Sequence, residues 1–295
     1  MNERPVISVG MPVFNCRQTL RDAVVSIMRQ SFGDWELLIL DDGSTDGTAE
    51  LARSFGDPRI LVFSDGSNRG LAARLNEAVR LSRGEYFARM DGDDIAYPQR
   101  LTRQIDYLRA YPEIDLVGGW ALVFDSTFDV RGKRMTPESH AAICAAPWAG
   151  FPLIHPTFMA RKTWFERFPY DANLNKAQDQ ALLAGSCLSS RFANVQEIVL
   201  AYREDLPGLR KLWASRCCMM FGMFRAFRGE GRTCWAWRSV LAQTMRMLLD
   251  LVASVGPLRS YQVGRRSVAL SADDSRRWHE LIRQIHVKHP PHGME

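Results

Sequence analysis

The sequence predicts an α/β fold in which a mostly parallel central sheet is flanked by helices and followed by a helical C-terminal extension. Over the first half of the chain, short apolar runs alternate with segments whose apolar residues recur every three or four positions, the pattern of βαβ units. The alternation weakens beyond about residue 125, and residues 207–287 have predominantly helical character. A chain of 295 residues accommodates one large α/β domain and an appendage. We therefore expect a domain over residues 1–206 and an extension over residues 207–295.

The apolar runs and the amphipathic segments follow one another in a regular order. Strands are expected, in chain order, at residues 6–11, 36–40, 60–63, 86–90 and 116–123. Helices are expected between them at residues 19–29, 48–55, 71–81 and 98–111. The first of these helices has its apolar residues on one face, and the last begins at Pro98, where a missing N–H costs least. Further along, the pattern predicts a short helix at 140–146, a strand at 157–160 and a helix at 178–186.

Three polar loops follow strands of this predicted sheet. Pro12, Val13, Phe14 and Asn15 come after the first strand. Residues 41–46 follow the second strand, and residues 91–94 follow the fourth. Because functional loops of such sheets collect at the carboxyl ends of the strands, we expect these three loops to lie close together.

Five motifs taken together carry a resemblance to a known family. They are PVFN at 12–15, DDGSTD at 41–46, NRG at 68–70, GEY at 84–86 and DGDD at 91–94. In this order and spacing they resemble family 2 glycosyltransferases of the Rossmann-like GT-A fold, over roughly residues 5–205. The resemblance implies an inverting enzyme of the hexosyl- or N-acetylhexosaminyltransferase type. It would move a sugar from a nucleotide diphosphate donor, with UDP favoured, to a hydroxyl of a glycan or lipid-linked glycan in cell-surface polysaccharide or glycolipid synthesis.

The acidic loop has a physical rationale in that chemistry. A nucleotide diphosphate leaving group accumulates negative charge, and a hard divalent cation held by carboxylates neutralises it. The resemblance implies that Asp93 coordinates Mn²⁺ or Mg²⁺, that Asp91 contacts the metal or the ribose, and that Asp94 supports them, with Gly92 also at the donor. Taken alone, the same loop would equally suit a solvated acidic turn that caps a helix.

A second acidic pair is expected to select the nucleobase. A carboxylate can accept the N–H groups of uracil or guanine, and the resemblance favours Asp42, beside Asp41, for that contact, with residues 12–15 lining the same pocket. Arg69 and Arg74 lie in the segment that supplies an arginine to the base or phosphates in some relatives, and the sequence leaves the choice between them open. A plain turn and helix cap is the alternative for this acidic pair.

The catalytic base is expected later in the chain. An inverting transfer needs a carboxylate that takes the proton of the acceptor hydroxyl. Relatives carry it in an acidic pair that opens a helix, which implies Asp179 here, although Gln178 departs from the family pattern. As a lone aspartate before a helix, Asp179 would more often be an N-cap. His155 resembles a family residue on the acceptor side, and a structural histidine is the alternative.

The standard motifs of several other classes of enzyme are missing from the sequence. The Q-x-x-R-W signature of processive enzymes does not follow Asp179, which favours a single transfer per encounter. The sequence also lacks G-x-G-x-x-G after a strand, G-x-x-x-x-G-K-[ST], H-E-x-x-H and G-x-S-x-G. Two alternatives remain: a transferase that loads a sugar onto polyprenyl phosphate, and a non-catalytic subunit that binds nucleotide sugars.

The excess of basic residues over acidic ones lies in the C-terminal extension. The net charge is +5, yet residues 207–295 contain 15 Lys and Arg against 6 Asp and Glu. Tryptophans interleave with these arginines, which suits either a membrane surface that presents a lipid-linked acceptor or a helical lid. The apolar stretch 239–255 is too short and too interrupted to span a bilayer, and no module accompanies the charge that would indicate nucleic acid.

Cellular location is inferred from the N-terminus and from cysteine usage. The first residues run into a strand without the features of a signal peptide. The six cysteines show no C-x-x-C spacing, which fits reduced thiols. We expect a cytoplasmic protein, with peripheral attachment to the inner face of the membrane as a further expectation.

Overall fold

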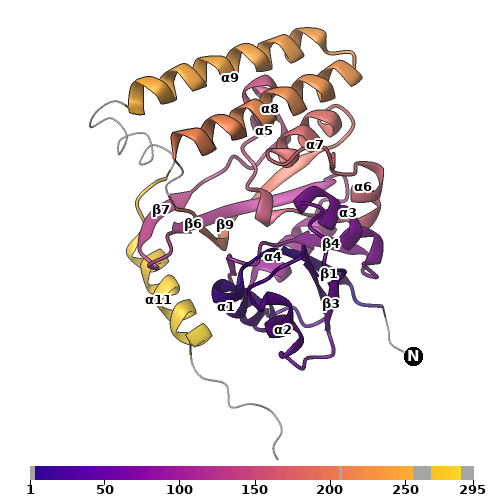
Figure 1. Ribbon diagram of the computed structural model, residues 1–295, viewed down its shortest axis with the longest axis vertical. Helices are drawn as coiled ribbons and strands as arrows, with labels where there is room; N and C mark the ends of the chain where they lie inside the picture. Colours follow the sequence, from indigo (N-terminus) through magenta and orange to yellow (C-terminus); the bar gives the residue numbers. More distant parts are fainter. Residues whose placement is uncertain (1–3, 206–207, 255–266, 287–295) are drawn as a thin grey trace, which may run out of the picture.

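The computed structural model describes residues 4–205, 208–254 and 267–286 (Figure 1). Nine strands form one sheet. They are β1 (Ile7–Val13), β2 (Trp35–Asp41), β3 (Ile60–Ser64), β4 (Tyr86–Arg89), β5 (Ile95–Ala96), β6 (Leu116–Phe124), β7 (Val130–Arg134), β8 (Met159–Arg161) and β9 (Phe192–Arg203).

The strand order is β3-β2-β1-β4-β8-β6-β9-β5, and β7 pairs with β6. Strands β3, β2, β1 and β4 pair in parallel. Strand β8 runs antiparallel to both β4 and β6, whereas β9 is parallel to β6. The carboxyl ends of β1, β2 and β4 therefore meet at one edge of the sheet, which places the three polar loops beside one another.

The helices cover both faces of the sheet. They are α1 (Arg17–Met28), α2 (Thr48–Arg53), α3 (Leu71–Leu81), α4 (Arg100–Ala110), α5 (His140–Ile143), α6 (Lys162–Arg167), α7 (Gln178–Ser186), α8 (Leu209–Gly229), α9 (Thr233–Ser254) and α11 (Ala272–His286). Two short 3-10 segments, η1 (Pro147–Ala149) and η2 (His155–Thr157), lie between α5 and β8.

The core explains why the central strands read as continuous apolar runs. Every residue of β1 and β2 is buried, because helices pack against both faces of these strands. One apolar cluster includes residues of α1 and α4, such as Leu20 and Ile105. The other includes residues of α3, α6 and α7, such as Leu75, Phe165 and Leu183.

Most predicted elements are present, with shifts at their ends. The predicted helices 71–81 and 178–186 match α3 and α7 to the residue. The strand predicted at 157–160 begins only at Met159, because His155–Thr157 forms a 3-10 turn first. The helix predicted at 140–146 ends at Ile143. Strand β9, the longest at 12 residues, and helix α6 were not predicted.

The C-terminal extension is helical and packs back onto the sheet domain. Helices α8 and α9 lie side by side, and α8 packs against α7 (Figure 1). Helix α11 contributes Trp278, Leu281 and Ile285 to an apolar cluster that includes Leu122 and Phe124 of β6. Among the helices that the structure describes, none combines the length and the apolar character needed to cross a membrane.

Candidate functional site

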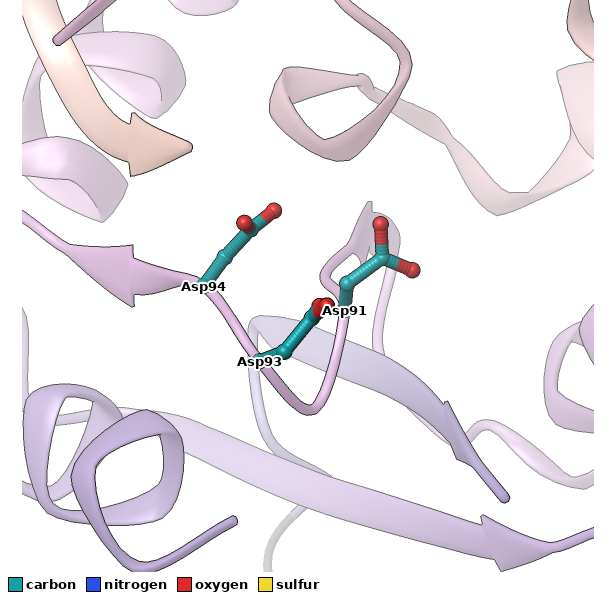
Figure 2. A group of neighbouring side chains, drawn as sticks. All are labelled: Asp91, Asp93 and Asp94. Atoms are coloured by element: carbon teal, nitrogen blue, oxygen red, sulfur yellow. The ribbon is translucent and has the colours of Figure 1, made fainter. Parts of the chain in front are cut away.

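Three aspartates project from one tight turn between β4 and β5. One carboxylate oxygen from each of Asp91, Asp93 and Asp94 lies within 4.8 Å of the others (Figure 2). The turn lies against the end of β1 because Gly92 has no side chain: a Cβ there would be 2.8 Å from Val13 Cγ1. The Thr19 hydroxyl donates a 3.0 Å hydrogen bond to the Gly92 carbonyl and holds the turn onto α1.

Burial and mutual repulsion disfavour the charged form of two carboxylates of this turn. Burial, reinforced by the charge of Asp91, raises the pKa of Asp93 to about 6. Burial, reinforced by the charges of Asp93 and Asp91, raises the pKa of Asp94 well above its usual range. Asp94 Oδ1 accepts a 2.9 Å bond from the Arg203 amide, whereas its buried Oδ2 has no partner among the described residues. An all-oxygen set with an orphaned carboxylate oxygen fits a hard divalent cation such as Mn²⁺ or Mg²⁺.

Two arginines that the sequence did not indicate surround this turn. Arg89, the last residue of β4, is buried and forms an ion pair with Asp91. Burial disfavours its charge, but Asp91 raises its pKa above the ordinary value. Arg203 Nε donates a 3.0 Å bond to the Asp93 carbonyl. The position of Arg89, two residues before Asp91 on an apolar strand, is the signal that would have identified it.

Asp41 and Asp42 are held by groups of the chain itself. Asp42 accepts hydrogen bonds from the Arg69 amide at 2.7 Å, the Gly70 amide at 2.9 Å and Arg74 Nε at 2.9 Å. Asp41 accepts bonds from the Ser44 amide and the Ser64 hydroxyl. Both carboxylates therefore hold the loops at the carboxyl end of β2 in place through hydrogen bonds within the chain.

The structure distinguishes the two arginines that the sequence left as alternatives. The Arg74 side chain is 2% exposed and pairs with Asp42, with Asp65 at 2.6 Å and with Glu77 at 2.8 Å. The Arg69 side chain is 45% exposed and pairs with Glu77 at 3.2 Å. Arg74 is thus enclosed by carboxylates, and Arg69 is the arginine whose head group a ligand can reach.

The loop after β1 joins the other two loops. Pro12 and Val13 are buried, whereas Phe14 is 52% exposed. Asn15 has a φ of 49°, and its side chain accepts a 2.9 Å bond from the Thr45 amide. Its own amide donates to the Ser44 hydroxyl at 2.9 Å.

Cys16 shows directly how close the loops lie. Its amide donates a 3.0 Å bond to the Thr48 hydroxyl at the start of α2. Its thiol has a pKa raised to about 12, first by burial and then by the charge of Asp93. The ends of β1, β2 and β4 therefore converge on one region, as predicted.

Asp179 lies in the first turn of α7. The cap of this helix is Ala177, whose φ of 55° is in the left-handed region, so Asp179 is not the cap residue. Burial raises the pKa of Asp179, while a 3.1 Å bond from Gln180 Nε2 lowers it. Asp179 lines a cavity of about 1010 Å³. Gln178, where the sequence departs from the family, is buried and does not line that cavity.

A part-buried pair, His155 and Tyr170, lies near both Asp179 and the acidic turn. His155 Nε2 lies 3.0 Å from the Tyr170 hydroxyl, and burial, with the nearby charge of Arg89, lowers the pKa of His155 well below its usual range. Burial raises the pKa of Tyr170, and the charges of Arg89, Asp179 and Asp91 all act on it. His155 is therefore a neutral, hydrogen-bonded residue that lines the cavity of Asp179.

Comparison with known proteins gives a family match over more than half of the chain. The model of the family described as glycosyl transferase family 2 matches residues 8–184. The chain is 40% identical over 164 residues to the putative glycosyltransferase EpsE of Bacillus subtilis, covering 55% of this chain and 58% of the relative. It is 28% identical over 133 residues to the UDP-Glc:alpha-D-GlcNAc-diphosphoundecaprenol beta-1,3-glucosyltransferase WfgD of Escherichia coli, covering 45% and 52%. The matches span little more than half of the length of either relative.

Solved structures resemble the whole described fold. The S. aureus TarS fragment 1–349 in complex with UDP-GlcNAc has a TM-score of 0.59 at 14% identity, covering 95% of this chain and 80% of that one. The mannosyltransferase PcManGT of Pyrobaculum calidifontis in complex with GDP-Man and Mn²⁺ has a TM-score of 0.56 at 19% identity, covering 95% and 86%. These similarities confirm the predicted α/β fold of the GT-A type with a helical C-terminal region.

Proposed function

We propose, because the chain belongs to glycosyl transferase family 2, that it transfers a sugar from a nucleotide diphosphate donor to a hydroxyl of a glycan or lipid-linked glycan, with inversion. Residues 1–206 would form the transferase domain, and a UDP-sugar is the favoured donor. The observation that carries the proposal is that the three-aspartate turn and Asp179 both lie close enough to one buried arginine, Arg89, for its charge to act on their carboxylates.

The donor would bind where the three loops converge. Phe14 offers an exposed ring for a nucleobase, and Arg69 offers an accessible cation for the base or phosphates. Asp93 and Asp91 would hold Mn²⁺ or Mg²⁺, with Asp94 beside them. Such a cation supplies positive charge to the departing diphosphate. Asp42 would shape the base pocket through the loop that it fastens, in addition to any direct contact with the base.

The acceptor would bind in the cavity that Asp179 lines. A volume of about 1010 Å³ accommodates a saccharide, and the half-buried carboxylate faces into it. Burial raises the pKa of Asp179, which makes the carboxylate a stronger base toward the acceptor hydroxyl. As the acceptor oxygen attacks the anomeric carbon, Asp179 takes its proton and the nucleotide diphosphate leaves from the opposite face. His155 would help to orient the acceptor from the same cavity.

Two features of the comparisons support the choice of substrates. WfgD, by its name, uses UDP-Glc and a diphosphoundecaprenol-linked acceptor. The TarS and PcManGT structures hold UDP-GlcNAc and GDP-Man. The chain would act in cell-surface polysaccharide or glycolipid synthesis at the cytoplasmic face of the membrane.

The proposal is tested by release of the nucleotide diphosphate from a panel of UDP- and GDP-sugars, with saccharide and lipid-linked acceptors, in Mn²⁺ or in EDTA. We expect acceptor-dependent release that requires the cation. Asp179→Asn should lower kcat by at least about 100-fold, because removal of a general base costs two to four orders of magnitude. Asp106→Asn, an exposed aspartate of α4, serves as the control with unchanged activity. Full activity of Asp179→Asn would refute the assigned base.

A further inference from the structure

Helix α9 turns its polar side toward the protein. Ser239 and Gln243 are fully buried against the rest of the chain. Asp250, 9% exposed, forms an ion pair with Arg216 of α8, and Arg246 donates a hydrogen bond to the Ala149 carbonyl of η1. The side of this helix that packs on the domain is therefore rich in polar and charged groups, the reverse of an ordinary surface helix.

The opposite side of α9 is exposed and apolar. Trp237, Leu241, Met245, Leu248 and Val252 follow one another at spacings of four, four, three and four, so they share one side of the helix. Their exposed fractions run from 50% to 63%. Single exposed leucines are ordinary, but a continuous stripe of large apolar residues marks an interaction surface. We call these five residues the α9 stripe. The helix that carries them forms the outermost layer of the molecule (Figure 1).

The exposed charges of the helix pair α8–α9, which carries the α9 stripe, are almost all cationic. The exposed charged residues of the α8–α9 pair include a single acidic one, Glu230. The basic ones are Arg210, Lys211, Arg225, Arg228, Arg232 and Arg238. An exposed apolar stripe on a helix pair whose exposed charges are lysine and arginine is the composition of a surface that lies in the interface of an anionic membrane. A second copy of this chain would bring two such cationic helix pairs together, which disfavours self-association through this surface.

The inner side of α9 forms a wall of the cavity that contains Asp179. Arg246, Leu249 and Asp250 line that cavity from α9, and Met219 lines it from α8. Leu249 follows Leu248 of the α9 stripe directly in the sequence. The same helix therefore carries the α9 stripe and part of the wall of the cavity of Asp179.

We propose that the α9 stripe inserts into the headgroup region of an anionic lipid bilayer, and that the cavity behind it receives the sugar portion of a lipid-linked acceptor held in that bilayer. The second half of this statement rests on the proposed function. The docking itself rests on the α9 stripe and on the cationic charge of the α8–α9 pair alone. This arrangement keeps the lipid chain of the acceptor in the membrane while its terminal sugar reaches Asp179.

Vesicle sedimentation tests the docking with the full chain. Phosphatidylcholine vesicles are compared with vesicles that also contain about 30% phosphatidylglycerol, at low and high salt. We expect binding to the anionic vesicles that weakens as salt rises. The double variant Leu241→Glu/Leu248→Glu should bind at least about 10-fold more weakly, because charged groups replace apolar surface at the interface. A matched pair of substitutions elsewhere, Leu188→Glu/Val130→Glu, replaces exposed apolar residues outside α9 and should bind like the wild type.

Activity on two kinds of acceptor separates this inference from the proposed function. The variant Leu241→Glu/Leu248→Glu should keep its kcat on a short-chain, water-soluble acceptor and lose turnover of a long-chain acceptor in vesicles. Vesicle binding by Asp179→Asn should equal that of the wild type, since docking does not need the base. Equal vesicle binding by the double variant and the wild type would overturn the docking. So would a wild-type dimer that the double variant dissociates, because the stripe would then bind a second copy. Vesicle binding without transfer to any acceptor would refute the proposed function and still support the docking.

Discussion

Arg89 and Asp91 form an ion pair at the end of β4 in which the arginine side chain is 3% exposed and the aspartate 24% exposed. Arg89 Nε and Nη1 have no hydrogen-bond partner among the described residues. The pair therefore joins a buried cation to the turn that carries the acidic cluster, and the same cation acts electrostatically on His155 and Asp179.

Removal of the acidic partner of this pair should destabilise the protein. Asp91→Asn leaves the buried Arg89 cation without its nearest counter-charge, and breaking a buried pair from one side costs about 3–5 kcal/mol. Because Asp91 is partly exposed, we expect a loss of about 2–3 kcal/mol in the free energy of unfolding. Urea denaturation measures it, with Asp106→Asn as the control. A loss no larger than that of the control would show that Arg89 finds its counter-charge elsewhere.

Asp93 should make stability depend on pH in the absence of a cation. Its pKa is raised from 3.8 to about 6, so the folded protein binds this proton more tightly than the unfolded chain does. The contribution of Asp93 to stability is favourable at low pH and is lost as the pH rises from about 4 to about 6. In EDTA, Asp93→Asn should therefore be more stable than the wild type by about 2 kcal/mol at neutral pH. The difference should shrink as the pH is lowered toward about 4.

Mn²⁺ bound at Asp93 should stabilise the folded protein at neutral pH, where the ionised carboxylate without a cation destabilises it. A ligand that binds only the folded state raises the melting temperature by mass action. We expect Mn²⁺ to raise the Tm of the wild type at neutral pH and to have a much smaller effect on Asp93→Asn. Thermal melts over a range of Mn²⁺ concentrations measure both effects, and an equal shift in the two proteins would exclude Asp93 as a ligand.

Substitution of Arg74 should mainly affect stability, whereas substitution of Arg69 should mainly affect donor binding. Arg74→Met removes a buried cation from Asp42, Asp65 and Glu77, and it should lower the free energy of unfolding by about 3 kcal/mol. Arg69→Met alters an exposed pair and should change stability by less than about 0.5 kcal/mol. It should raise the KM for the nucleotide sugar severalfold. Urea titration and donor kinetics on both variants measure these effects. A lower stability of Arg69→Met than of Arg74→Met would contradict the prediction.

Gly92 should be required for the position of the acidic turn. In Gly92→Ala the new Cβ would lie 2.8 Å from Val13 Cγ1 and 3.1 Å from Cys16 Sγ, so the turn must move away from β1. We expect weaker Mn²⁺ binding and at least about a 10-fold lower kcat/KM, because small displacements of reacting groups are costly. The double variant Gly92→Ala/Val13→Ala removes the clashing methyl group and should recover part of the activity. No recovery would indicate that the backbone, and not Val13, sets the requirement.

The local elements were predictable because their signals are local. The pattern in 71–81 specified α3 to the residue. Strand β9 gave no such signal, because most of its residues are buried and the alternation of apolar and polar residues is lost. The short helix α6, at Lys162–Arg167, is too brief for its periodicity to stand out.

The site was only partly predictable, because its partners come from distant parts of the chain. Acidic motifs at strand ends predicted Asp93 and Asp42 as residues of the site. No spacing in the sequence relates Asp42 to Arg74, 32 residues away, or Asp94 to the Arg203 amide, 109 residues away. The roles given to Asp93, Asp42 and Asp179 remain predictions.

The sequence by itself determined the alternation of strands and helices in the first half of the chain, the family and the acidic turn, because hydrophobic periodicity and short motifs are properties of neighbouring residues. Only the tertiary structure decided which charges are buried, which arginine remains accessible and which side of α9 faces outward. Those properties depend on what the closed fold places against each side chain. The desolvation and the charge pairing that follow are set across the sheet and not along the chain.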